Sequence, residues 1–81
     1  MDLELYQEVA LTRNFPEYQL QEGDIATLID FVPHPNGGET GCVLEVFNAV
    51  GESINVVTVP ISAIKKLTSH EILSSRKLIN L

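Results

Sequence analysis

The chain has 81 residues, of which 44% are hydrophobic and 20% are charged. This length excludes a second domain, and the apolar content excludes the composition of a disordered chain, so we expect one domain around one core. Eleven acidic residues against five basic ones give a net charge of −6, which repels phosphate backbones and favours basic partners. Alternatively, this charge only keeps a small protein soluble.

The N-terminal residues Met1–Glu4 are acidic, whereas a secretory signal begins with positive charge. No apolar stretch in the sequence approaches the ~20 residues that span a bilayer. The single Cys42 cannot form an internal disulfide, although small secreted domains usually contain several. We therefore expect a cytoplasmic protein.

Two strands are predicted in the first half of the chain. Residues Tyr6–Thr12 alternate between apolar and polar side chains, which is typical of a half-buried strand. Pro16 interrupts this pattern, and Glu22–Asp24 form a strong turn signal before a second strand, Ile25–Val32. Strict alternation in that strand places Ile25, Thr27, Ile29 and Phe31 on one face and Ala26, Leu28, Asp30 and Val32 on the other.

Three further strands are predicted after a loop. Two prolines and three glycines make residues Pro33–Gly41 irregular. Cys42–Asn48 and Ile54–Val59 then form a hairpin, with Val43, Glu45 and Phe47 on the face opposite Cys42, Leu44 and Val46. Pro60 ends this hairpin, Ile61–Ile64 form a 3₁₀ turn, and Lys65–Leu67 are the last short strand.

Five short strands predict a small closed or nearly closed β-barrel over residues 1–67, because closure removes exposed edges. Residues 68–81 are a C-terminal extension. Thr68 and Glu71 have the spacing of a capping box, and Ile72, Leu73 and Ile79 could share one side of a helix. We expect a short, frayed helix there, or alternatively a docking segment that becomes ordered on a partner.

Few side chains in this sequence suggest catalysis or metal binding. Cys42 and His34, oriented by Glu39, could form a nucleophile and base, but Cys42 opens an apolar strand where a small buried residue is expected. His34, Cys42 and His70 lack the paired spacing of a zinc site. We therefore expect no catalytic site, no metal and no cofactor.

Nucleic-acid binding is the main alternative, because Glu22–Ile29 resembles the opening of the KOW motif of ribosomal and transcription proteins. The basic residues that such proteins use around this turn are absent. The region instead contains Glu17, Glu22, Asp24 and Asp30. The available cations lie mainly at the C-terminal end, at Lys65, Lys66, Arg76 and Lys77.

Several segments, in this order, resemble a family of small bacterial proteins known only as a domain of unknown function. The segments are Ala10–Arg13, Pro16–Tyr18, Leu20, Gly23–Leu28, Leu44–Phe47 and Val57–Pro60. The similarity covers about residues 5 to 67 and implies an SH3-like barrel without an established activity, cofactor or catalytic residue. The tail after Thr68 and a long Pro33–Gly41 loop depart from the family pattern.

We therefore expect a non-enzymatic protein-interaction module. It would serve as an accessory or neutralising partner of another small protein, similar to an antitoxin or immunity protein, and its acidic charge favours a basic partner. Six residues are predicted to bind the partner, namely Phe15, Glu17, Tyr18, His34, Ile72 and Leu73. Alternatively, Phe15 and Tyr18 cover the open end of the barrel. A KOW-like nucleic-acid-binding barrel is the competing function, and the sequence leaves the oligomeric state open.

Overall fold

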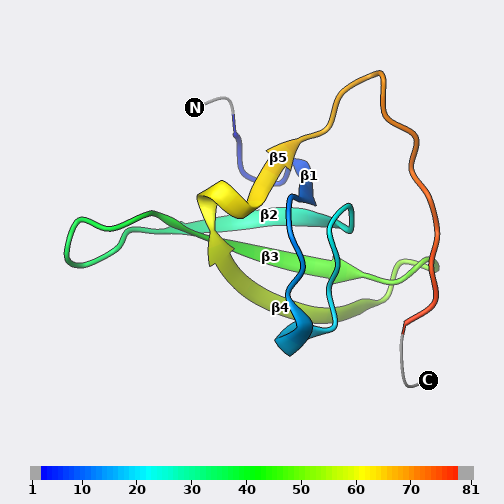
Figure 1. Ribbon diagram of the computed structural model, residues 1–81, viewed down its shortest axis with the longest axis horizontal. Helices are drawn as coiled ribbons and strands as arrows, with labels where there is room; N and C mark the ends of the chain where they lie inside the picture. The colour runs from blue at the N-terminus through cyan, green and yellow to red at the C-terminus, as the bar shows by residue number, and fades with distance from the viewer. Residues whose placement is uncertain (1–2, 79–81) are drawn as a thin grey trace.

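The computed structural model describes residues 3–78 and is mostly β (Figure 1). Its strands are β1 (Glu8–Leu11), β2 (Ile25–Val32), β3 (Gly41–Phe47), β4 (Ser53–Pro60) and β5 (Ile64–Lys66), with 3₁₀ turns η1 (Pro16–Tyr18) and η2 (Ile61–Ala63). The predicted five strands, and the 3₁₀ turn before the last of them, are confirmed. No helix in residues 3–78 is long and apolar enough to cross a membrane.

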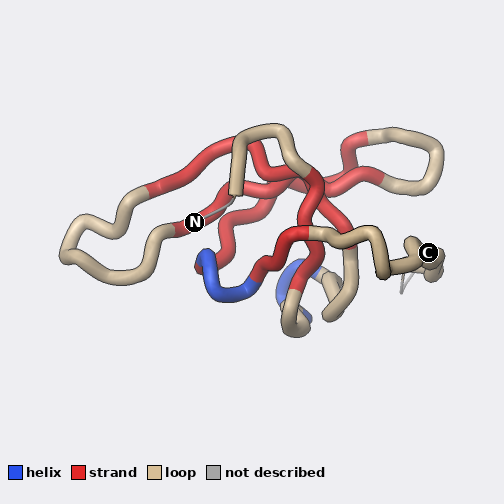
Figure 2. The backbone as a smooth tube through the Cα atoms, turned by 90° about the horizontal axis from the view of Figure 1, so that it is seen from above, coloured by secondary structure: helices blue, strands red, loops and turns tan. Residues whose placement is uncertain are grey.

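The five strands form one antiparallel sheet in the order β4-β3-β2-β1-β5. Strands β4 and β5 are its two edges, so the sheet is open and the predicted closure is not made by a backbone ladder. The chain instead passes from one edge to the other through η2, which directly connects β4 to β5. The sheet is strongly curved, and β4 curls beneath the other strands (Figures 1 and 2).

The hydrophobic core lies against one face of the sheet, which we call the inner face. Leu28, Leu44 and Val57 form a row across β2, β3 and β4, and all three are buried. The alternation predicted for the hairpin is confirmed here, because Cys42, Leu44 and Val46 are buried. The remaining core residues include Val9, Leu11, Phe15, Leu20, Ala26, Val59, Ala63 and Ile64.

A β-bulge in β2 changes which side chains reach the core. The pairing register between β2 and β3 shifts between Leu28 and Asp30. The extra residue, Ile29, moves the side chains after it to the opposite face, so Phe31 packs against the core. The prediction that Phe31 shares a face with Ile25 is therefore wrong, because strict alternation cannot include an inserted residue.

The helix predicted after Thr68 is also absent from the described residues. The capping contacts do form: the Thr68 N–H donates to Glu71 Oε1 at 2.8 Å, and the Glu71 N–H donates to the Thr68 carbonyl at 3.2 Å. This single turn is followed by an extended segment without secondary structure through Leu78. The helix fails to propagate because nucleation is costly and the serines that follow are weak helix formers. Ile79 lies outside the described residues.

Candidate functional site

Three of the predicted partner-binding residues lie in or beside η1. Phe15 is 9% exposed and belongs to the core, so the expectation that its ring is an exposed contact is wrong. Its ring stacks on that of Tyr18, with centroids 6.2 Å apart, and Tyr18 itself packs against the core. This arrangement agrees with the alternative that the two rings cover one end of the core. Glu17 is exposed on the same turn.

His34 lies in the loop between β2 and β3, away from the other predicted residues. Its Nδ1 accepts the Asn36 N–H at 3.1 Å, and its ring lies against Gly38, where a Cβ atom would be 2.8 Å from the ring. These contacts give His34 a local role in shaping the loop. The loop extends from the end of the sheet opposite to the C-terminal tail (Figure 1).

Cys42 does not meet His34 as the nucleophile and base hypothesis requires. Cys42 is fully buried on the inner face, whereas His34 is exposed. Burial, and then the negative charge of Glu39, raise the pKa of the Cys42 thiol. Glu39 itself accepts the Ser62 N–H, which lowers the pKa of its carboxyl group. No group of three potential metal ligands occurs among residues 3–78.

The two remaining predicted residues lie on the tail, which we define as residues 68–78. Ile72 is 92% exposed and Leu73 is 63% exposed. Contiguous apolar patches, more than single exposed side chains, mark contact sites for other molecules, so the neighbours of these two residues matter. Leu73 also lines two cavities between the tail and the sheet. Several other residues that line these cavities were not among the predicted partner-binding residues.

Phe47 and Ile54 line one of these cavities, and Val56 lies two residues after Ile54 on β4. Phe47 and Val56 lie on the outer face of the sheet, the face opposite to the core, because Phe47 alternates with Glu45 and Val56 pairs with it. Phe47 is 42% exposed, Ile54 is 40% exposed and Val56 is 53% exposed. They come from the end of β3 and from β4, the edge strand, and we call them the hairpin patch. A bulge between Val46 and Phe47 interrupts the register here. The patch is a concentration of half-exposed apolar side chains outside the core.

Carboxylates accompany the hairpin patch on the outer face. Glu8, Thr27, Glu45 and Val56 are consecutive partners across β1, β2, β3 and β4, so two acidic side chains share a row with Val56. Glu45 Oε2 accepts the Ser53 hydroxyl at 2.7 Å, which holds that carboxylate beside the hairpin. The outer face therefore combines apolar contact area with negative charge.

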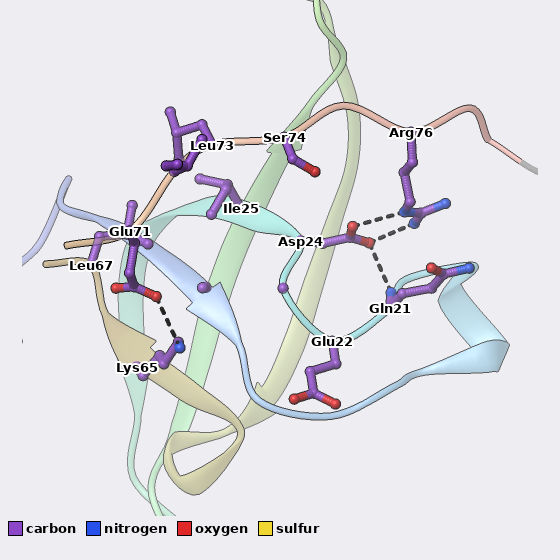
Figure 3. Close-up of a pocket in the computed structure, with 13 residues that line it drawn as sticks. Gln21, Glu22, Asp24, Ile25, Lys65, Leu67, Glu71, Leu73, Ser74 and Arg76 are labelled. Atoms are coloured by element: carbon purple, nitrogen blue, oxygen red, sulfur yellow. Dashed lines mark hydrogen bonds and ion pairs between the residues drawn. The ribbon is translucent and has the colours of Figure 1, made fainter. Parts of the chain in front are cut away.

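The tail contacts the turn before β2 and the end of η1 through Arg76 (Figure 3). The Arg76 Nε–H donates to Asp24 Oδ1 at 2.8 Å, and Nη2 donates to Asp24 Oδ2 at 2.5 Å. Nη2 also donates to the Gln19 carbonyl at 3.0 Å. We call the Asp24 carboxylate together with the Gln19 carbonyl the arginine site.

The turn before β2 positions the arginine site. Gln21 N–H donates to Asp24 Oδ2 at 2.8 Å, and the Leu11 N–H donates to the Asp24 carbonyl at 2.9 Å, so this turn is fixed to β1. Gly23 adopts a φ of +90°, which a side chain would disfavour. Gln19 ends η1 in the left-handed region, with a φ of 58°. The two acceptors are thus held by backbone geometry on separate turns.

The electrostatics of the arginine site favour the ion pair. Burial raises the pKa of Asp24, but the hydrogen bonds from Arg76 and Gln21 and the charge of Arg76 outweigh that effect, so the pKa lies below 3.8. The same contacts raise the pKa of Arg76. A second ion pair joins the tail to β5, with 3.0 Å between Lys65 Nζ and Glu71 Oε2, and it lowers the pKa of Glu71.

Two cavities lie between the tail and the sheet. One, of about 350 Å³, is lined by Ala10, Ile25, Leu67, Ile72 and Leu73 among others. The second, of about 480 Å³, is lined by Ile25, Phe47, Ile54, Leu73 and Leu78 among others, and so reaches the hairpin patch. Arg76 and Asp24 line both cavities. The tail therefore covers this region without filling it.

Sequence reasoning missed the hairpin patch and the arginine site for different reasons. The alternation of β3 placed Phe47 on the face of Glu45, and a carboxylate marks a solvent-facing side, so the exposure of Phe47 could have been inferred. Asp24 and Arg76 are 52 residues apart. Nothing in their local patterns links them.

The family described as Domain of unknown function (DUF4926) matches residues 5–66 of the chain. This match covers all five strands and ends before the tail. No curated protein matches the chain significantly. No solved structure does so either.

Proposed function

The chain belongs to the DUF4926 family, and from the structure of this member we propose that it is a non-enzymatic protein-interaction module. Its partner is another protein with a basic surface, for which the chain serves as an accessory or neutralising partner. The family description names no activity, so the proposal depends on the surface of this chain.

The observation that carries the proposal is the hairpin patch. Phe47, Ile54 and Val56 expose between 40% and 53% of their surface at the end of β3 and along β4. Protein interfaces are characterised by a central apolar or aromatic contact area surrounded by polar groups. The patch has this composition, with Glu45 beside Val56 and the Ser53 hydroxyl bound to Glu45.

Charge indicates the kind of partner. Residues 1–60 contain ten acidic residues and one basic residue, which gives this part of the chain a net charge of −9. The outer-face row that ends in Val56 includes Glu8 and Glu45. Complementary charge accelerates encounter and orients the partner, so lysines or arginines should surround the apolar residues that contact the patch.

Three finer features belong to the same proposal. We assign the fold to the SH3-like barrels, a proposal supported by the strand order and by the 3₁₀ turn between β4 and β5. We place the protein in the cytoplasm, because Cys42 is a free buried thiol. A bacterial source follows from the resemblance of the sequence and stays a prediction.

Nucleic-acid binding is less well supported than protein binding. Lys65, Lys66, Arg76 and Lys77 are the four basic residues of segment 61–81. Two of them already hold carboxylates, since Lys65 pairs with Glu71 and Arg76 pairs with Asp24. Phosphate binding depends on cations that are free to displace counterions. We expect no binding of labelled RNA at low salt, where phosphate-driven binding is strongest.

Substitution within the hairpin patch tests the proposed function. Val56→Lys places a cation in the apolar patch and should reduce partner capture at least tenfold, because a buried unpaired charge is costly at an interface. The measurement is quantitative affinity capture from the native host with wild-type and variant chains, followed by titration of the purified partner.

Val32→Lys is the matched control for this experiment. Val32 is 45% exposed in β2, at the end of the sheet that carries the His34 loop, so the variant changes charge and exposure similarly outside the patch. The control should bind the purified partner like the wild type. Equal loss in both variants, a partner unaffected by Val56→Lys, or tight salt-sensitive RNA binding would each contradict the proposal.

A further inference from the structure

The tail contacts the body mainly through side chains. Among the described residues, its backbone-to-backbone hydrogen bond is the local one from Glu71 to Thr68, and none joins it to the sheet. Arg76 and Glu71 provide the polar contacts with the body, at Asp24, Gln19 and Lys65. A segment held in this way can leave without disrupting a strand ladder or a core residue.

The fit of the tail's apolar residues is incomplete. Ile72 is almost fully exposed, and most of Leu73 is exposed, although both line cavities between the tail and the sheet. Cavities of about 350 Å³ and about 480 Å³ remain beside the Asp24 contact, and Asp24 and Arg76 line both of them. A better-matched segment could therefore bury more apolar surface there than the tail does.

The arginine site, in contrast, fits a guanidinium group closely. The two Asp24 oxygens accept parallel N–H groups at 2.8 Å and 2.5 Å, which is the bidentate geometry that arginine makes and lysine cannot. The Gln19 carbonyl accepts a further bond from Nη2. The arginine site therefore provides the specificity of this surface, whereas the tail is the part that another segment can replace.

We propose that the tail is a displaceable internal ligand and that the partner protein supplies an arginine in an extended segment, which replaces Arg76 at the arginine site. This inference rests on the proposed function, whose hairpin patch borders the larger cavity at Phe47 and Ile54. Displacement of the tail opens the groove between Ile25 and the patch, so the partner's arginine and its apolar residues bind one continuous surface. The tail then competes with the partner and sets the affinity.

The test uses the full chain with Arg76→Ala and an end-capped peptide of sequence Ile-Leu-Ser-Ser-Arg-Lys-Leu, which copies residues 72–78. NMR titration should show peptide binding at Gly23, Asp24 and Gln19. The wild type should bind the same peptide at least tenfold more weakly, because its own Arg76 is present at high effective concentration. A peptide with lysine in place of arginine should bind the Arg76→Ala chain at least fivefold more weakly.

Asp24→Asn in the Arg76→Ala background should abolish peptide binding. If that variant fails to fold, the lysine peptide still tests the site, since it leaves the protein unchanged. The proposal is overturned if the peptide binds wild type and Arg76→Ala equally, binds neither, or binds equally with lysine. It is also overturned if the wild type forms dimers that Arg76→Ala abolishes, because a second copy would then occupy the site.

The outcome is independent of the test of the proposed function. If the peptide does not bind but partner capture still depends on Val56, the internal-ligand proposal is wrong and the interaction-module proposal stands. If the peptide binds as expected but partner capture does not depend on Val56, the hairpin patch is not the interface and the arginine site stands.

Discussion

Leu44 illustrates how single residues hold the sheet around its core. It has no exposed surface, and it lies between Leu28 and Val57 in the row that crosses β2, β3 and β4. Replacement by alanine removes buried apolar atoms of β3 that lie between Leu28 of β2 and Val57 of β4. The strands around it cannot collapse freely, because their spacing is fixed by backbone hydrogen bonds.

We therefore expect Leu44→Ala to lower the free energy of unfolding by about 2 to 5 kcal/mol. Urea denaturation monitored by circular dichroism measures this change. Thr58→Ala, an exposed position in β4, is the control and should change the stability by less than about 0.5 kcal/mol. Similar effects of the two substitutions would show that Leu44 does not lie in a close-packed core.

At the scale of elements, the boundaries of the strands could be predicted and the irregularities within them could not. Alternation, proline and glycine positions indicated β2, the β3–β4 hairpin and η2 to within about two residues. The bulge at Ile29 gave no signal, because Ile29 suits either face of a strand. The tail was misassigned for a related reason, since the turn at Thr68 and Glu71 matches the first turn of a helix.

Acidification should release the tail from the arginine site. Because the pKa of Asp24 in the folded chain lies below its ordinary value, docking favours the carboxylate form. The contribution of the ion pair is fully present above pH 3.8 and is lost as the pH falls through the lowered pKa. Protonation of Asp24 therefore does not weaken the ion pair at neutral pH.

The Arg76 Nε–H resonance, followed by NMR from pH 6 downward, measures this release. It should lose its docked shift only below pH 3.8, while the amide of Leu44 reports whether the core is intact. Glu71→Gln is the control, because Glu71 pairs with Lys65 and its protonation could also release the tail. The change in the Arg76 resonance should be the same in this variant. A docked resonance in the Asp24→Asn variant, or release well above pH 5, would contradict this assignment.

The whole molecule combines an apolar core on the inner face with an acidic, partly apolar outer face. The fold class, strand number and net charge could be predicted, because they depend on composition and local periodicity. Of the candidate site, only Leu73 and Ile72 could be predicted from the sequence. It joins residues from β2, β3, β4 and the tail, and only the three-dimensional arrangement brings Asp24 and Arg76 together.

Salt and charge act at the same scale. With a Debye length of about 8 Å at physiological ionic strength, attraction between this acidic chain and a basic partner is strongest at low salt and affects the association rate more than the dissociation rate. The contacts of the hairpin patch are apolar and should persist as salt increases. Partner binding should therefore keep more of its affinity at high salt than phosphate binding, which depends on released counterions.

Mapping the contact surface of the purified partner by NMR tests the central claim most directly. Addition of the partner to the isotope-labelled chain should perturb the amides of Phe47, Ile54 and Val56 most strongly, together with Asp24 and the tail residues that leave the arginine site. If the largest changes instead occur in the His34 loop or around η1, the outer face is not the interface and the account is wrong.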